Sequence, residues 1–216
     1  MAQLFAAQPA NDLPKVPNFN VCPTNPVHAV QAGEGGRQLV AMRWGFLPHW
    51  YKTHTAGPLL INARAETIAQ KPAFAAAARE RRCLIPASGF YEWTKAEGGA
   101  RLPWYIHRSD GAPIAFAAVW QSWGADDPVK TCAIVTTAAN QGLSAIHHRM
   151  PLILEPEDWG KWLGEEGHGA AALMQPGAEG VLDYHRVDPA VNSNRAEGPE
   201  LIEPFEAGDT PRGRLI

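Results

Sequence analysis

The sequence predicts an α+β fold: a single domain with a curled, mainly antiparallel, barrel-like β-sheet core and a few flanking helices. Strand-like runs outnumber helical runs, and 19 prolines and 20 glycines cut the chain into short segments. Residues 1–216 contain no internal repeat and no linker long enough to separate two domains. Many short strands with few helices are typical of one α+β domain of this length.

The predicted strands are runs rich in branched and aromatic residues, which favour extended structure. Residues 95–102, KAEGGARL, carry a glycine pair and predict a hairpin turn between two of the strands. In chain order the runs occupy residues 38–46, 59–65, 83–93, 102–108, 114–123, 130–139, 151–155 and 183–187.

Two segments predict helices. Residues 71–82 are rich in alanine and place Pro72 near the first turn, where proline is tolerated. Residues 155–164 begin with acidic side chains and end at Gly164, in keeping with the helix dipole and a glycine stop.

The two ends of the chain carry weaker signals. Met1, Leu4 and Phe5 have helical spacing, but no capping residue precedes them, so they predict the second half of a short helix. The C-terminal residues 206–216 are predicted to be a loose tail.

Composition narrows the class of protein. No run reaches the ~18 apolar residues of a membrane span, and no signal peptide is present, so a cytoplasmic protein is expected. Cys22, Cys83 and Cys132 are too few for a disulfide scaffold and lack zinc spacing. Cys83 and Cys132 lie in apolar runs and are expected to be buried, and no metal or cofactor is expected.

The net charge of −3 argues against a protein that coats nucleic acid through bulk charge. A local basic patch is therefore needed for any nucleic-acid contact, and Arg79, Arg81 and Arg82 form one candidate cluster.

Polar side chains beside several strands are the candidate functional residues. Alternation along a strand places Asn62 and Arg64 on one face, Glu92 ends another strand, and His147 and Arg149 precede a third. Each has a structural alternative: a strand-end glutamate is usually solvated, a lone histidine is usually structural, and an asparagine can cap a turn.

The motifs together resemble the SRAP family, the SOS-response-associated peptidase-like proteins that bind abasic sites in single-stranded DNA. The resemblance covers about residues 18–204. It is carried by NVCPTNP, RWGFLPHW, PLLINARAET, RRCLIPASGFYEW, IVTTAANQGLSAIHHRMP and VNSNRAEGPELIEP, in this order.

The resemblance implies a covalent chemistry at the N-terminus. SRAP proteins use the α-amine of a cysteine, exposed when the initiator methionine is removed, to form an imine with the ring-opened abasic sugar. The thiol then closes a thiazolidine, which leaves a stable DNA–protein crosslink. An α-amine suits this reaction because its pKa near 8 leaves a neutral fraction at pH 7.

The resemblance also implies roles for three catalytic residues. Glu92 would carry protons during ring opening and imine formation, with flanking aromatics raising its pKa. His147 would be the second proton carrier or steady a phosphate, and Asn62 would hydrogen-bond the sugar.

Further positions are implied to contact DNA. Arginines would hold phosphates, and tryptophans would stack where the base is missing. These residues are Asn20, Trp50, Arg64, Trp93, Thr136 and Arg149.

One departure concerns the N-terminus, because the family begins Met-Cys-Gly-Arg-Phe and this sequence begins Met-Ala-Gln-Leu. Either the nucleophile has been lost, or the chain starts at an internal methionine; the helical spacing at the start favours the second explanation. The chain as given is expected to bind DNA without forming the covalent product.

Three functions remain open from the sequence. The first is an abasic-site processing protein that acts on single-stranded DNA as a monomer. The second is a peptidase or hydrolase that uses the same Glu92, Asn62 and His147. The third is a non-catalytic module that binds junctions of single-stranded DNA.

Overall fold

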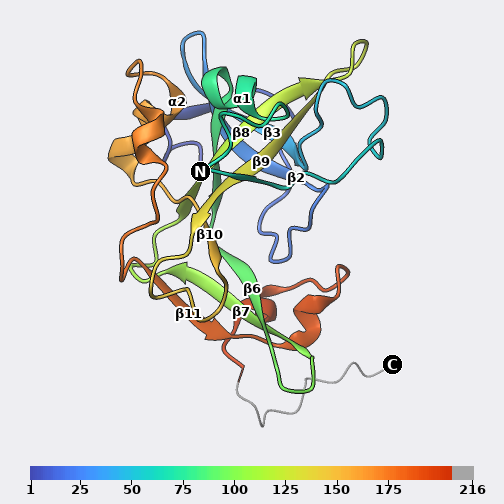
Figure 1. The fold of residues 1–216 in the computed structure, drawn as a ribbon, viewed down its shortest axis with the longest axis vertical. Coiled ribbons are helices and arrows are strands. Elements are labelled where there is room, and N and C mark those ends of the chain that lie inside the picture. The colour runs from blue at the N-terminus through green and yellow to red at the C-terminus, as the bar shows by residue number, and fades with distance from the viewer. Residues whose placement is uncertain (206–216) are drawn as a thin grey trace.

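The computed structural model describes residues 1–205 and consists mainly of two β-sheets, the larger above the smaller in Figure 1. The larger sheet has the strand order β1-β3-β2-β5-β8-β9-β10, with β4 beside β9, and the smaller has the order β11-β7-β6. The strands are β1 Ala7–Pro9, β2 Pro26–Gly33, β3 Gly36–Trp44, β4 Asn62–Arg64, β5 Arg82–Ala87, β6 Gly89–Lys95, β7 Arg101–Arg108, β8 Ile114–Trp123, β9 Val129–Ala138, β10 Arg149–Pro151 and β11 Leu182–Arg186.

The larger sheet curls on itself, which confirms the predicted barrel-like core. Antiparallel pairs run from β3 through β2, β5 and β8 to β9, and β3 then meets β9 in parallel, with Trp44 opposite Cys132. The sheet is mixed rather than purely antiparallel, because β1 joins β3 and β4 joins β9 in parallel.

Apolar side chains cover both faces of the larger sheet, because successive residues of its apolar strands point to opposite faces. One face packs Leu84 and Val135 with Trp162 of α2. The other carries Cys83 and Cys132, both 0% exposed, which confirms the prediction that these thiols are buried.

Helices are short. Both helical predictions are confirmed by α1 and α2, and α2 ends at Gly164, whose φ of 87° is left-handed. The helices are α1 Ala75–Glu80 and α2 Trp159–Leu163, with 3-10 turns η1 Pro156–Asp158, η2 Ala170–Leu173, η3 Pro189–Asn192 and η4 Pro199–Ile202.

The N-terminal segment is a single turn rather than half a helix. Phe5 N–H donates to the Met1 carbonyl over 3.2 Å, and Ala6, with φ 48°, ends the turn before β1. Only Phe5 is buried, stacked on Trp159, so the helical spacing there reflects one apolar anchor. The predicted loose tail at 206–216 lies outside the described residues.

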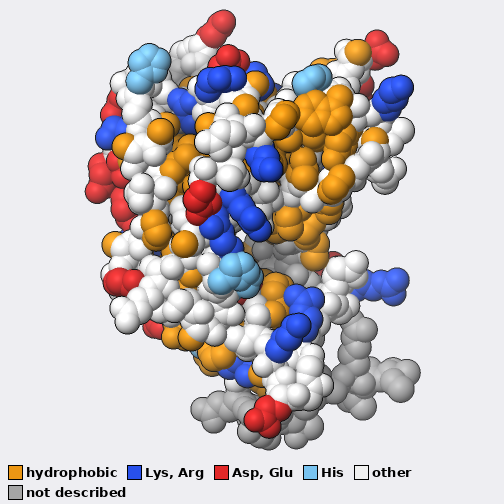
Figure 2. Space-filling view, viewed as in Figure 1, with side chains coloured by type: hydrophobic (Ala, Val, Ile, Leu, Met, Phe, Trp, Pro, Cys, Tyr) orange, Lys and Arg blue, Asp and Glu red, His pale blue; other side chains and the backbone are white. Residues whose placement is uncertain are grey.

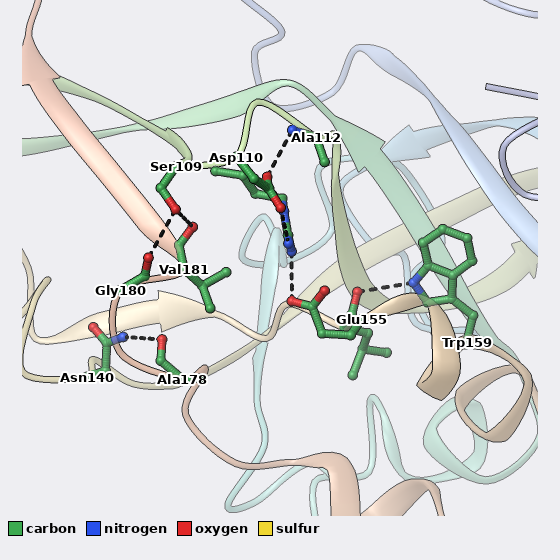
Figure 3. A network of polar contacts seen from close by, with 11 residues as sticks. Ser109, Asp110, Ala112, Asn140, Glu155, Trp159, Ala178, Gly180 and Val181 are labelled. Atoms are coloured by element: carbon green, nitrogen blue, oxygen red, sulfur yellow. Dashed lines mark hydrogen bonds and ion pairs between the residues drawn. The ribbon is translucent and has the colours of Figure 1, made fainter.

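The smaller sheet is the predicted hairpin β6–β7 with β11 added at its edge. A polar network fixes the end of β7 to the segment before α2 (Figure 3): the Arg108 guanidinium donates to Asp110 over 2.7 Å and to Glu155 over 2.7 Å. On one face of this sheet Ile106 packs under the 139–148 segment, and on the other Tyr105 packs against Val187.

Candidate functional site

Glu92 lies in the middle of β6, Gly89–Lys95. Register places it opposite Trp104, on the face that Ile106 shares. Its side chain is only 26% exposed. Burial raises the pKa of Glu92 above its ordinary value, and the neighbouring His147 charge opposes part of that increase.

His147 is brought to Glu92 by the 139–148 segment. Leu143 and Ile146 of this segment are buried against Ile106, so the segment lies across the smaller sheet. The His147 Nδ1 atom is 3.7 Å from the Glu92 Oε1 atom, and it accepts from or donates to the Arg149 backbone at 3.2 Å and 3.0 Å. The ring is therefore held in place with one edge toward the carboxylate.

Arg149 begins β10 and connects the pocket to the larger sheet. Its guanidinium forms two hydrogen bonds with Glu66, of 2.7 Å and 2.9 Å, and donates to the Thr136 carbonyl over 2.6 Å. The Arg149 hydrogen bond lowers the pKa of Glu66 to about 2. Arg149 Nε is buried without a partner among the described residues, so the guanidinium keeps one unused donor.

Strand β4 presents Asn62 and Arg64 on one face, as predicted from alternation. Both are exposed and the intervening Ala63 is buried. Arg64 is opposite Thr136 in the parallel pairing with β9, and Thr136 contacts Arg149. Within residues 1–205 the side chains of Asn62 and Arg64 make no hydrogen bond, so their donors are available to a ligand.

Contacts link Glu92 through His147 and Arg149 to Thr136, which lies opposite Arg64. Figure 2 shows Lys and Arg side chains, with an acidic side chain and a histidine, along the middle of one face beside a hollow between the upper and lower parts. Such a strip of positive charge next to a shielded carboxylate suits a polyanion that must bring a reactive atom to an acid or base.

Two predicted DNA-binding residues have structural partners in this chain. The Asn20 amide donates to the Ser193 and Ala196 carbonyls over 2.9 Å and 3.1 Å. Trp93 faces away from Glu92, where its indole N–H donates to Asn192 over 2.7 Å. Their contact with DNA remains a prediction.

Trp50 fits a stacking role better, because 48% of it is exposed. It lies after β3 in a loop where Leu59 is also exposed, and a large exposed indole needs a partner or a use. The contact of Trp50 with DNA likewise stays a prediction.

The prediction that Arg82 belongs to an exposed basic cluster near α1 is wrong. Its guanidinium donates to the Ala78 and Trp162 carbonyls, so it joins α1 to α2. Arg81 forms an ion pair with Glu80, which leaves Arg79 as the exposed arginine of the three. Unsatisfied helix carbonyls explain the use of Arg82.

Sequence reasoning missed Trp104 as a neighbour of the site. The signal was available, since a hairpin centred on residues 95–102 pairs Glu92 with Trp104 once its register is fixed. No group of three His, Cys, Asp or Glu side chains suited to a metal occurs in residues 1–205. Over the same residues no helix is long and apolar enough to cross a membrane.

Comparison with known proteins finds relatives that are named abasic site processing proteins. The chain is 34% identical over 192 residues to the abasic site processing protein YoqW of Bacillus subtilis (strain 168), covering 87% of this chain and 86% of that protein. It is 35% identical over 210 residues to the abasic site processing protein YedK of Escherichia coli (strain K12), covering 93% and 92%.

The fold has solved counterparts as well. A crystal structure of a protein from Bacteroides thetaiotaomicron superposes with a TM-score of 0.75 at 26% identity, covering 85% of this chain and 82% of that one. The sequence model of the SOS response associated peptidase (SRAP) family matches residues 1–194. This chain therefore belongs to the SRAP family.

Proposed function

We propose that this protein recognises abasic sites in single-stranded DNA and processes them with Glu92, His147 and Asn62. The observation that carries the proposal is the distance of 3.7 Å between His147 Nδ1 and Glu92 Oε1, next to Arg149. The names of the relatives YoqW and YedK support the same substrate.

The chemistry begins with Glu92. Because burial raises its pKa, the carboxyl group holds a proton nearer to neutral pH than an exposed glutamate does. It can donate that proton to the ring oxygen as the bond from this oxygen to the anomeric carbon breaks, and it can later recover a proton from the amine that attacks the aldehyde carbon. The anomeric hydroxyl gives up its own proton as the aldehyde forms. His147 lies close enough to take or return it, and the free Asn62 amide orients the sugar.

DNA is held on both sides of this pocket. Arg64 offers unpaired donors to a phosphate, and Arg149 can exchange part of its contact with Glu66 for another. Thr136 lies between these two arginines. Trp50 supplies a stacking surface, Trp93 offers a second one on the opposite face of the smaller sheet, and Asn20 braces the adjoining loop.

Covalent trapping depends on an N-terminal cysteine, and position two of this chain is alanine. Cys83 and Cys132 are 0% exposed, and Cys22 carries no free α-amine. A thiol alone adds reversibly to an aldehyde but cannot close a thiazolidine. We infer that residues 1–216 bind abasic DNA as a monomer, and that a stable crosslink requires a cysteine with a free α-amine.

The test compares this chain with a version that begins Met-Cys-Gly-Arg-Phe. Each is incubated with single-stranded DNA that contains one abasic site and with the same DNA without it. We expect tighter binding of the abasic strand by both proteins and a heat-stable crosslink from the cysteine version alone. Equal affinity for the two strands contradicts the proposal, and cleavage of an added protein substrate assigns the pocket to a peptidase instead.

A further inference from the structure

A row of side chains leads away from Glu92 across the smaller sheet. In the antiparallel register Glu92 is opposite Trp104, and Trp104 is opposite Arg186. Directly opposed residues share a face, so all three lie on the side of the sheet that carries the pocket. Arg186 is two strands from Glu92, roughly 10 Å at the usual spacing.

Packing fixes the planes of this row. The Arg186 guanidinium lies over the Trp104 ring at 5.3 Å, and its Nε donates to the Pro103 carbonyl over 3.1 Å. The Trp104 indole N–H donates to Thr94 over 3.0 Å. The guanidinium and the indole are thus both held in place, and a cation fixed over an aromatic ring is a surface beside which a nucleobase can stack.

Tyr184 extends the same surface to the sheet edge. Its ring meets Trp104 edge-on at 5.7 Å, and 38% of the residue is exposed. Neighbouring Asp183 is opposite His107 and so belongs to the other face. We call Trp104, Tyr184 and Arg186 the aromatic ledge.

We propose that the aromatic ledge binds the nucleotide next to the abasic site, and this inference rests on the proposed function. Its base stacks on the Tyr184 ring, and its phosphate is held by the Arg186 charge. A baseless sugar offers no ring to stack, so selectivity for abasic DNA needs a neighbouring base held in register with Glu92. The aromatic ledge would hold the neighbouring base two strands away from Glu92.

The experiment uses the full chain and short single-stranded oligonucleotides with a stable tetrahydrofuran abasic analogue. The set carries the analogue with no base-bearing neighbour, with one on the 5′ side, or with one on the 3′ side. We expect one neighbour to strengthen binding at least about fivefold. With 2-aminopurine at that position, the unaltered protein should quench its fluorescence.

Variants assign the effect to the ledge. Tyr184→Ala and Arg186→Gln should each remove most of the gain from the neighbour, whereas Tyr184→Phe, which keeps the ring, should retain it. Arg37→Gln is the charge-matched control, because Arg37 pairs with Glu165 away from the pocket and the ledge.

The outcomes separate the two proposals. If the unaltered protein prefers abasic DNA but gains nothing from either neighbour, or the gain survives Tyr184→Ala and Arg186→Gln, the ledge assignment is overturned and the proposed function stands. If the unaltered protein shows no preference for abasic DNA, both are overturned.

Discussion

Glu92 and His147 lie 3.7 Å apart, Oε1 to Nδ1, although one comes from a strand of the smaller sheet and the other from the segment before β10. The carboxylate is raised in pKa by burial, and the imidazole is held by the backbone of Arg149. Two groups that can pass a proton are thus fixed beside donors suited to phosphate.

Glu92→Gln should slow crosslinking by the cysteine-bearing version about 10²-fold or more, because it removes proton transfer and keeps the shape of the side chain. Affinity for abasic DNA should stay near that of the parent. Crosslinking rates and equilibrium binding are measured on the same preparation. Glu165→Gln, which alters an ion pair with Arg37 outside the site, is the control; an unchanged rate in Glu92→Gln removes this residue from the mechanism.

Stability should depend on pH through Glu92. Its pKa is raised above 4.5 in the fold, so between 4.5 and the raised value the native state keeps a proton that the unfolded state releases. The free energy of unfolding therefore falls as pH rises through that window. Denaturant titrations of the parent and of Glu92→Gln should show this slope only in the parent; parallel curves would contradict the assignment.

Glu66 should behave in the opposite direction. Arg149 lowers its pKa to about 2, so its contribution is present above 4.5 and is lost as pH falls from 4.5 toward 2. The effect should be small because the carboxylate is largely exposed. Unfolding of the parent and of Glu66→Gln is compared from neutral pH down to about 2. The difference in stability should shrink below pH 4.5, and a difference that stays constant over the whole range would contradict the prediction.

Arg149→Gln should weaken DNA binding and reduce the salt slope of the affinity by about one, as expected when one phosphate contact is lost. Arg37→Gln is a matched control, because Arg37 also forms a two-bond pair with a glutamate, at 2.8 Å and 2.8 Å, but away from the pocket. Affinities measured at several salt concentrations decide the matter, and equal slopes for both variants would exclude a phosphate contact at Arg149.

Trp50→Ala should lower DNA affinity by about 1–3 kcal/mol, the usual contribution of one stacked base. The melting temperature should change little, because the side chain is 48% exposed and adds little to the core. Trp50→Phe should recover part of the affinity. A large loss of stability with intact binding would instead make Trp50 a structural residue.

Asn20→Ala should destabilise the fold by about 0.5–1.5 kcal/mol, since it removes the donor to the Ser193 and Ala196 carbonyls, which are exposed or only partly buried. Thermal unfolding measures this loss. DNA affinity at a temperature where the variant is fully folded distinguishes bracing from contact: unchanged affinity supports bracing alone, and a loss there supports the predicted contact.

The sequence alone determined the local features. Alternation placed Asn62 and Arg64 on one face, the glycine pair predicted the β6–β7 hairpin, and Gly164 marked the end of α2. These depend on neighbours within a few residues, so period and turn chemistry are enough to predict them. The helix prediction for the N-terminal segment was wrong, because Met1, Leu4 and Phe5 have helical spacing but only Phe5 is buried.

Tertiary structure alone decided which of these local features meet. The parallel pairing of β4 with β9 sets Arg64 opposite Thr136, and packing of the 139–148 segment on the smaller sheet brings His147 to Glu92. Such contacts join residues distant in sequence, and they form only because burial of apolar surface outweighs the entropy of closing long loops. The periodicity of the sequence therefore does not predict which distant residues meet.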